Sequence, residues 1–254
     1  MKKMFFALGL IFLIMSIPKV AILQNNAIQK STARGAVYLA ERGHITRSRN
    51  FYDSNPHWEN IKLDNIVIPF DRGGLIEFIL DPFDPINRAW ICLGDPDIYS
   101  KGAVWRTDNL DDPKPSWTLI LKEADILKGT GFTHAWVKRI KASKLQRGLI
   151  FIVITGDHGL SFVGRSDDYG ANWTWSNRLS SLGGRSVGFE LSSRDVNRLW
   201  VGIAVPSRIF VSNDRGNTFS ELVTLNLELW NPSDIYVPAE NNPDDKIIFT
   251  VANE

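Results

Sequence analysis

The stretch Arg165-Ser166-Asp167-Asp168-Tyr169-Gly170-Ala171-Asn172-Trp173 decides the fold, and its pattern recurs in Val211-Ser212-Asn213-Asp214-Arg215-Gly216-Asn217-Thr218-Phe219. Both copies read Ser-x-Asp-x-Gly-x-(Asn/Thr)-aromatic. Ser and Asp side chains hydrogen-bond the backbone N–H groups of a tight turn, and Gly supplies a positive φ. The aromatic residue then begins the next strand facing a core. Each copy is therefore predicted to be a β-turn between two antiparallel strands.

Working outward from these turns gives a repeating unit of four strands. The predicted first strands are residues 75–80, 135–140, 186–191 and 233–238, and the second strands are 87–92, 146–151, 197–202 and 245–250. The third strands are 102–105, 160–163 and 208–211, and the fourth are 116–120, 173–176 and 219–223. In the first unit the turn motif is degenerate and continues into the Pro-containing run 110–115. This repeat predicts an all-β fold, a β-propeller of four-stranded antiparallel blades, over a β-sandwich.

The closure of the propeller has two interpretations. The last unit stops after its second strand, while residues 35–38 match the third strand at 102–105 and residues 57–63 read like a fourth strand. One interpretation is three full blades plus a split fourth, closed by N- and C-terminal strand pairs, which satisfies the sheet edges. The other is the N-terminal part of a longer propeller.

The turn motif resembles the Asp-box, or bacterial neuraminidase repeat, found in β-propellers of sialidases, other glycoside hydrolases and sortilin-like receptors. The resemblance implies that the turns lie on the rim away from the active face, and it assigns these residues a structural role: Ser166, Asp168, Gly170, Trp173, Ser212, Asp214, Gly216, Thr218 and Phe219. Sialidases also carry an aromatic-Arg-Ile-Pro motif. The nearest match here is Ser207-Arg208-Ile209-Phe210, which lacks the proline, so the resemblance supports the fold more strongly than it supports sialidase activity.

The N-terminus has the pattern of an export signal. Lys2 and Lys3 precede an apolar run at residues 4–17, followed by Pro18 and Lys19. This arrangement predicts a signal peptide or an N-terminal membrane anchor at residues 1–23, a polar linker at 24–34 and the propeller at 35–254. A secreted or extracytoplasmic protein is expected, with membrane attachment through the N-terminal segment as the variant in which the signal stays uncleaved.

Composition argues against several classes of site. The formal net charge of +1 and the absence of a Lys/Arg run predict no nucleic-acid partner. Cys92 is the only cysteine, so neither an intramolecular disulfide nor a cysteine metal cluster can form. The four histidines lack metal-ligand spacing. No metal and no cofactor are expected.

In a propeller, the loops from strand four to the next strand one and from strand two to strand three gather on one face, called here the loop face. Binding and catalysis in loop-rich folds concentrate at such loops. Glycosidases need two carboxylates across the sugar, and the weak catalytic candidates are Asp71, Asp95 and Asp157. Arginines can grip a carboxylate and tryptophans can stack on sugars, so the predicted ligand-binding residues are Arg72, Asp97, Tyr99, His134, His158, Arg185 and Trp230.

Two main functions follow from these features, and a third possibility is a scaffold or assembly factor held at a membrane by residues 4–23. The first is an exported Asp-box repeat propeller that binds a glycan or an extracellular protein through its loop face without catalysis. The alternative is a secreted glycoside hydrolase, sialidase-like or glucanase-like, that uses the loop carboxylates.

Overall fold

The computed structural model describes residues 27–30, 36–41, 44–63, 66, 74–95, 100–179, 186–203, 207–224, 231–236 and 248–252. Within these residues the chain is nearly all β, with four four-stranded antiparallel sheets and one two-stranded sheet. Blade 1 consists of β1 (Ala27–Lys30), β2 (Val37–Glu41), β3 (His44–Ser48) and β4 (Glu59–Ile61). Blade 2 consists of β5 (Gly74–Leu80), β6 (Ala89–Asp95), β7 (Ser100–Thr107) and β8 (Thr118–Leu121).

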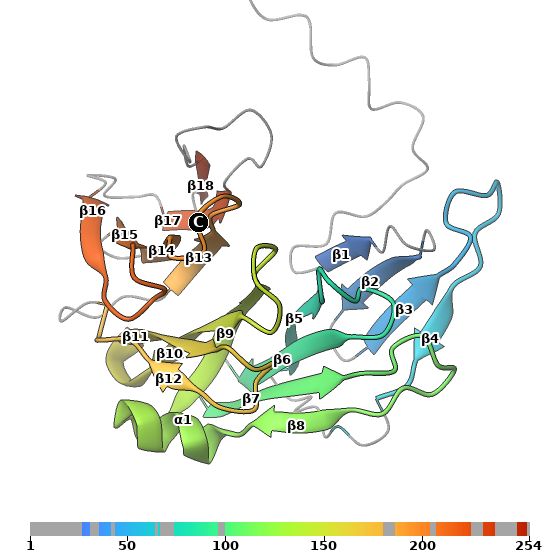
Figure 1. The fold of residues 1–254 in the computed structure, drawn as a ribbon, viewed down its shortest axis with the longest axis horizontal. Coiled ribbons are helices and arrows are strands. Elements are labelled where there is room, and N and C mark those ends of the chain that lie inside the picture. The colour runs from blue at the N-terminus through green and yellow to red at the C-terminus, as the bar shows by residue number, and fades with distance from the viewer. Residues whose placement is uncertain are drawn as a thin grey trace, which may run out of the picture.

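The next two blades repeat this order. Blade 3 consists of β9 (Ala135–Ala142), β10 (Ile150–Gly156), β11 (Ser161–Ser166) and β12 (Thr174–Trp175). Blade 4 consists of β13 (Ser186–Leu191), β14 (Leu199–Ile203), β15 (Arg208–Ser212) and β16 (Ser220–Thr224), and β17 (Asn231–Tyr236) pairs with β18 (Ile248–Ala252). Figure 1 shows the sheets following one another around an arc. The predicted all-β propeller of four-stranded blades is confirmed.

The prediction of a split fourth blade, closed by N- and C-terminal strand pairs, is wrong. Residues 37–41 are the second strand of blade 1 and not a third strand, because β2 pairs with β1 on one side and with β3 on the other. Strand β3 was not predicted because most of its residues are polar, and two of them, Arg47 and Ser48, are buried. Its sequence therefore lacks the apolar residues by which a buried strand is recognised. Strand β1 also lies within the segment predicted to be a linker, residues 24–34. Blade 1 is thus a complete sheet without strands from the C-terminus.

The sheet of blade 3 is buried on both faces, because successive side chains of a strand point to opposite sides and each side packs on a neighbouring blade. In blade 3, Ile150, Ile152 and Ile154 pack into the core shared with blade 2. Phe151 and Val153, on the other face of β10, pack into the core shared with blade 4. Burying one such side chain stabilises a fold by about 1.5 to 3 kcal/mol. A second strand therefore reads as a continuous apolar run rather than an alternating one.

The two predicted turns have the expected hydrogen bonds. Ser166 Oγ donates to Asp168 Oδ1 at 2.8 Å and accepts from the Gly170 N–H at 2.8 Å. Asp168 Oδ1 also accepts from the Asn172 N–H at 2.8 Å, and Gly170 has φ 94°. In blade 4, Ser212, Asp214 and Gly216 repeat the arrangement, with distances of 2.7 and 2.8 Å. We call this element the serine–aspartate turn.

Blades 1 and 2 carry the same turn with asparagine in place of aspartate. In blade 2, Asn109 Oδ1 accepts from Thr107 Oγ1 and from the Ser116 N–H, each at 2.9 Å. In blade 1, Asn50 Oδ1 accepts from Ser48 Oγ at 3.3 Å and from the His57 N–H at 2.8 Å. An amide oxygen thus replaces a carboxylate oxygen as acceptor, so the turn is present in all four complete blades.

An arginine at the end of each of the first three third strands joins consecutive blades. Arg47 donates to the Leu110 carbonyl at 2.9 Å, Arg106 to the Tyr169 carbonyl at 3.0 Å, and Arg165 to the Arg215 carbonyl at 3.2 Å. Each acceptor carbonyl belongs to the residue after the Asn or Asp of the next blade's turn. We call this contact the arginine staple. The equivalent residue of blade 4 is Val211.

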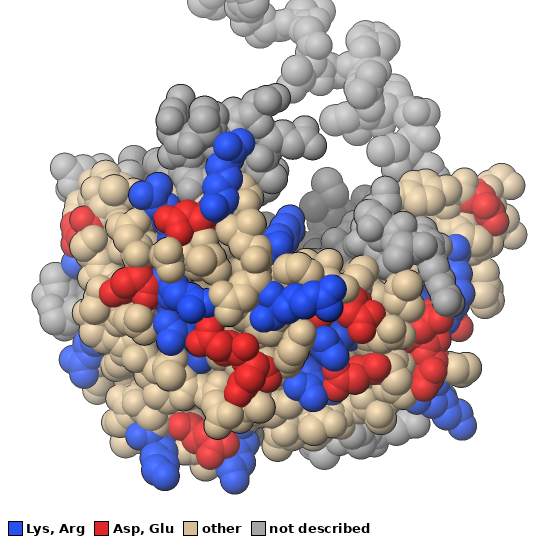
Figure 2. All heavy atoms as spheres, in the orientation of Figure 1, with Lys and Arg blue, Asp and Glu red and all other residues tan. Residues whose placement is uncertain are grey.

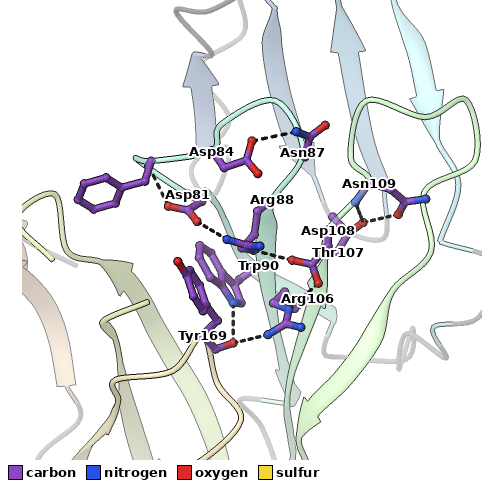
Figure 3. A network of polar contacts seen from close by, with 11 residues as sticks. Asp81, Asp84, Asn87, Arg88, Trp90, Arg106, Thr107, Asp108, Asn109 and Tyr169 are labelled. Carbon is purple, nitrogen blue, oxygen red and sulfur yellow. Dashed lines mark hydrogen bonds and ion pairs between the residues drawn. The ribbon is translucent and has the colours of Figure 1, made fainter. Parts of the chain in front are cut away.

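Figure 3 shows the staple between blades 2 and 3. Arg106 reaches the Tyr169 carbonyl and also donates through Nε to Asp108 at 2.9 Å. Arg88 bonds Asp108 as well, and its guanidinium lies 4.2 Å from the centre of the Tyr169 ring. The side of the propeller that carries the turns is therefore held together by charged groups that contact each other directly.

Two glycines provide a matched test of the turn. Gly170 and Gly216 both have positive φ, which costs an alanine about 1 to 2 kcal/mol. A Cβ on Gly170 would lie 2.2 Å from Ile120 Cδ1, whereas a Cβ on Gly216 would find its nearest atoms at 3.5 Å. We expect Gly216→Ala to lower the unfolding free energy by about 1 to 2 kcal/mol, and Gly170→Ala by about 1 kcal/mol more. Urea unfolding measures both, and equal losses would contradict the packing difference.

The staple is tested by Arg106→Met. Loss of the hydrogen bond to the Tyr169 carbonyl should lower the unfolding free energy by about 1 to 3 kcal/mol, measured by urea unfolding. Arg194→Met is the control because Arg194 is exposed and lies on the loop between β13 and β14. A change in Arg106→Met no larger than that in the control would show that the staple does not stabilise the fold.

Candidate functional site

Strand β11 separates the structural turns from the candidate site. The serine–aspartate turn follows its C-terminal end, and the short 3₁₀ segment Asp157–Gly159 precedes its N-terminal end. Six residues of extended chain span about 20 Å. The loop between β10 and β11 therefore lies on the opposite side of the blade from the turn, where the sequence predicts the loop face.

Helix α1 (Glu123–Thr130) leads the chain from blade 2 to this face. Glu123 and Asp125 lie in its first turn and Lys128 in its last, which suits the helix dipole. The helix ends at Gly131, which has φ 75° and donates its N–H to the Leu127 carbonyl at 2.8 Å. The left-handed glycine turns the chain so that residues 132–134 run along the pocket described below. The sequence analysis missed this helix.

Phe132 anchors that segment on blade 3. A Cβ on Gly156 would lie 2.2 Å from the Phe132 ring, so only glycine admits the ring against β10. Phe162 meets the same ring edge to face, with centroids 5.2 Å apart. Phe132 is 8% exposed. The ring therefore packs beneath the loop instead of offering a surface to a ligand.

Asp157 joins the two loops through its carboxylate. Oδ2 accepts from the Thr133 N–H at 2.6 Å, and Oδ1 accepts from Thr133 Oγ1 and the His134 N–H, each at 3.0 Å. His134 Nδ1 lies 3.4 Å from Oδ1 and 3.0 Å from Thr133 Oγ1. We call this set of contacts the aspartate clamp. It holds the residues after α1 against the residues after β10.

The clamp also sets the charge of Asp157. Burial alone raises the pKa of the carboxyl group, but the hydrogen bonds from Thr133 and His134 outweigh it, so the pKa lies below the ordinary aspartate value. The group is therefore ionised at neutral pH. General-acid catalysis requires a protonated carboxyl group with a raised pKa, and Asp157 has the opposite shift.

The two loops and the segment after β12 border an open pocket of about 560 Å³. Its exposed polar side chains are Thr133, His134, His158 and Arg178. His158 has φ 58°, a left-handed conformation that places it at the tip of the loop. The remaining lining residues are Gly131, Phe132, Asp157 and Leu160. The pocket thus presents hydrogen-bond donors and the Arg178 guanidinium around one ionised carboxylate that already has hydrogen-bond partners.

The structure brings three of the predicted site residues together: Asp157, His134 and His158. Thr133, Leu160 and Arg178 also line the pocket but were not predicted as site residues. Arg178 could have been predicted, because it lies in the connection from β12 to the next blade, and such connections belong to the loop face. The backbone of Asp95 ends β6, but its side chain lies outside the description. The other predicted residues also lie outside the described residues: Asp71, Arg72, Asp97, Tyr99, Arg185 and Trp230. Their roles stay predictions.

Other features of the described residues bear on the chemistry. No group of three His, Cys, Asp or Glu side chains in the described ranges is placed to hold a metal ion. Cys92 is fully buried, and burial raises the pKa of its thiol well above the ordinary value, which makes it a poor nucleophile. Figure 2 shows Lys and Arg interspersed with Asp and Glu over the visible face. Across the residues described, no helix has the length and apolar character needed to cross a membrane.

Comparison with known proteins identifies the fold. No protein-family model and no curated protein matches the sequence. A GH74 xyloglucanase from Xanthomonas campestris is similar in structure, with TM-score 0.54, 15% identity and coverage of 82% of this chain and 31% of that one. YCF48 bound to a D1 peptide has TM-score 0.50 and 15% identity, with coverage of 87% of this chain and 60% of that one. An exo-β-1,3-galactanase from Phanerochaete chrysosporium has TM-score 0.51 and 8% identity, with coverage of 89% of this chain and 56% of that one.

These likenesses show a β-propeller of the kind found in glycoside hydrolases and in a peptide-bound protein. This chain spans between 31% and 60% of the length of those three structures. At 15% identity or less the comparisons establish the fold.

The aspartate clamp is tested by Asp157→Asn. Because the folded-state pKa of Asp157 is lowered, its contribution is present above the unfolded value of about 3.9 and is lost as pH falls through the folded value. Asparagine cannot accept the Thr133 N–H through its amide nitrogen. We expect a lower melting temperature at pH 7 and a difference from wild type that shrinks below about pH 4. A difference that stays constant down to about pH 2 would contradict an ionised clamp.

Proposed function

We propose that this chain is a non-catalytic binding propeller whose loop-face pocket holds a polypeptide ligand. The observation that carries the proposal is the state of Asp157. It is the one carboxylate among the described residues that line the pocket, and three hydrogen bonds occupy it. Glycoside hydrolysis needs a pair of carboxyl groups, one protonated as the acid and the other ionised as the base or nucleophile. A carboxylate with three hydrogen-bond partners from the neighbouring loop instead serves to hold the two loops in a fixed shape.

The exposed groups of the pocket suit a peptide better than a sugar. Sugar sites offer an exposed aromatic face for stacking, whereas Phe132, the aromatic residue among the described lining side chains, is 8% exposed. Arg178, His134 and His158 can donate to backbone carbonyls or to a carboxylate. The peptide-bound YCF48 structure, a similar propeller, is consistent with this kind of ligand.

A second candidate function is glycan hydrolysis. Its support is the likeness to a GH74 xyloglucanase and to an exo-β-1,3-galactanase. On this alternative Asp157 would act as nucleophile or base with a second carboxylate from Asp71, Asp95 or Asp97. Export of the protein is part of both proposals and rests on Lys2, Lys3 and the apolar run at residues 4–17.

The two functions are separated by direct assays of the full chain. The probes are random dodecapeptides displayed on phage, a xyloglucan oligosaccharide and a β-1,3-galactan. We expect selected peptides to bind and neither glycan to be cleaved. Arg178→Ala should fold normally, because Arg178 is exposed and makes none of the clamp contacts, and it should weaken peptide binding by about tenfold. His134→Ala should weaken binding by a similar factor; it removes the ring contacts of the clamp but keeps the bond from the His134 N–H to Asp157.

Arg194→Ala is the matched control, since it removes an exposed arginine on the side of the turns and should leave peptide binding unchanged. Release of sugar that disappears in Asp157→Asn would overturn the binding proposal in favour of the hydrolase. Peptide binding that resists both pocket substitutions would place the ligand elsewhere.

A further inference from the structure

In blades 2 to 4 the serine–aspartate turn does more than connect two strands, because its apolar residues pack toward the preceding blade. In blade 2, Leu110 and Trp117 lie in the core shared with blade 1. In blade 3, Tyr169 and Trp173 pack against the core shared with blade 2, and in blade 4 Phe219 packs against the core shared with blade 3. These positions therefore mark the face by which a blade contacts its predecessor.

Blade 1 has the same positions. Its turn has the same hydrogen bond as the turn of blade 3. The Asp53 N–H donates to the Asn50 carbonyl at 2.9 Å, and the Ala171 N–H donates to the Asp168 carbonyl at 3.3 Å. Asn50 thus corresponds to Asp168. Phe51 then takes the place of Leu110 and Tyr169, and Trp58 takes the place of Trp117 and Trp173.

On blade 1 these residues are exposed. Phe51 and Trp58 are each 38% exposed and Tyr52 is 64% exposed, whereas Trp117 is 3% exposed. The Phe51 ring meets the Tyr52 ring at 5.4 Å and the Trp58 ring at 5.8 Å, both edge to face. Three contacting aromatic rings therefore lie at the position that a neighbouring blade covers in blade 2. We call Phe51, Tyr52 and Trp58 the blade 1 aromatic patch.

The border of the patch carries both signs of charge. Arg49 is 41% exposed and Glu59 is 40% exposed, with Arg49 Nε 3.3 Å from Glu59 Oε1. Asp53 is exposed in the same loop. A surface with an apolar centre and a border of mixed charge has the composition of a protein interface, and exposed aromatic clusters mark interaction sites.

We propose that the blade 1 aromatic patch docks a second copy of this chain. Each interface that buries the equivalent residues pairs one blade of this repeat with another, so the surface that fits the patch is a surface of the same repeat. The formal net charge of +1 gives little repulsion between copies.

The test is sedimentation velocity of the full chain between about 1 and 100 µM, a range that detects micromolar association. We expect a concentration-dependent dimer. Tyr52→Ser removes the most exposed ring without touching a core, so it should fold normally and weaken the dimer at least tenfold, equivalent to about 1.4 kcal/mol. Trp58→Ser is a second variant at the position that other blades bury, and circular dichroism checks the fold of both.

Leu222→Ser is the matched control, because Leu222 is 52% exposed on β16, at the outer edge of blade 4. It should leave the dimer unchanged. A monomer at every concentration would overturn the proposal. A dimer that persists in Tyr52→Ser, or that is weakened equally by Leu222→Ser, would also overturn it. None of these outcomes depends on whether the loop-face pocket binds a peptide.

Discussion

The need to bury both faces of a blade is the constraint on which this structure depends. A strand such as β10 sends isoleucines to one side and Phe151 and Val153 to the other, so its sheet is stable only between two other sheets. Successive sheets satisfy this need by stacking around an arc (Figure 1). The same constraint explains why the face of blade 1 that carries Phe51 and Trp58 is apolar, since it belongs to a repeat whose faces are made to be covered.

The polar contacts have different roles on the two sides of the propeller. On one side, serine–aspartate turns fix each outer hairpin, and the arginine staples join a blade to its successor through a backbone carbonyl, which any residue at that position supplies. On the other side, the aspartate clamp fixes the connection from blade 2 to blade 3 against the loop between β10 and β11. The first set stabilises the scaffold. The second shapes a pocket that exposes His134, His158 and Arg178 on the side opposite to the turns.

The sequence predicts the propeller because turn chemistry is local: Ser166, Asp168 and Gly170 form their contacts within five residues, and the spacing between turns then defines the blade. It also places Asp157, His134 and His158 on one face, because strand order alone decides which loops share a side. It does not reveal β3, whose buried Arg47 is satisfied by the distant Leu110 carbonyl. Nor does it reveal the role of Asp157, since a clamp to Thr133 depends on how two loops meet.

The central claim is that the pocket at residues 131–134 and 157–160 binds a peptide while the turns only hold the blades. Hydrogen exchange measured by mass spectrometry, with and without a peptide selected for binding, tests it most directly. The account predicts slower exchange in those two loop-face segments and no change in the turns at residues 166–173 and 212–219. Protection confined to the turns, with the loop-face segments unchanged, would contradict it.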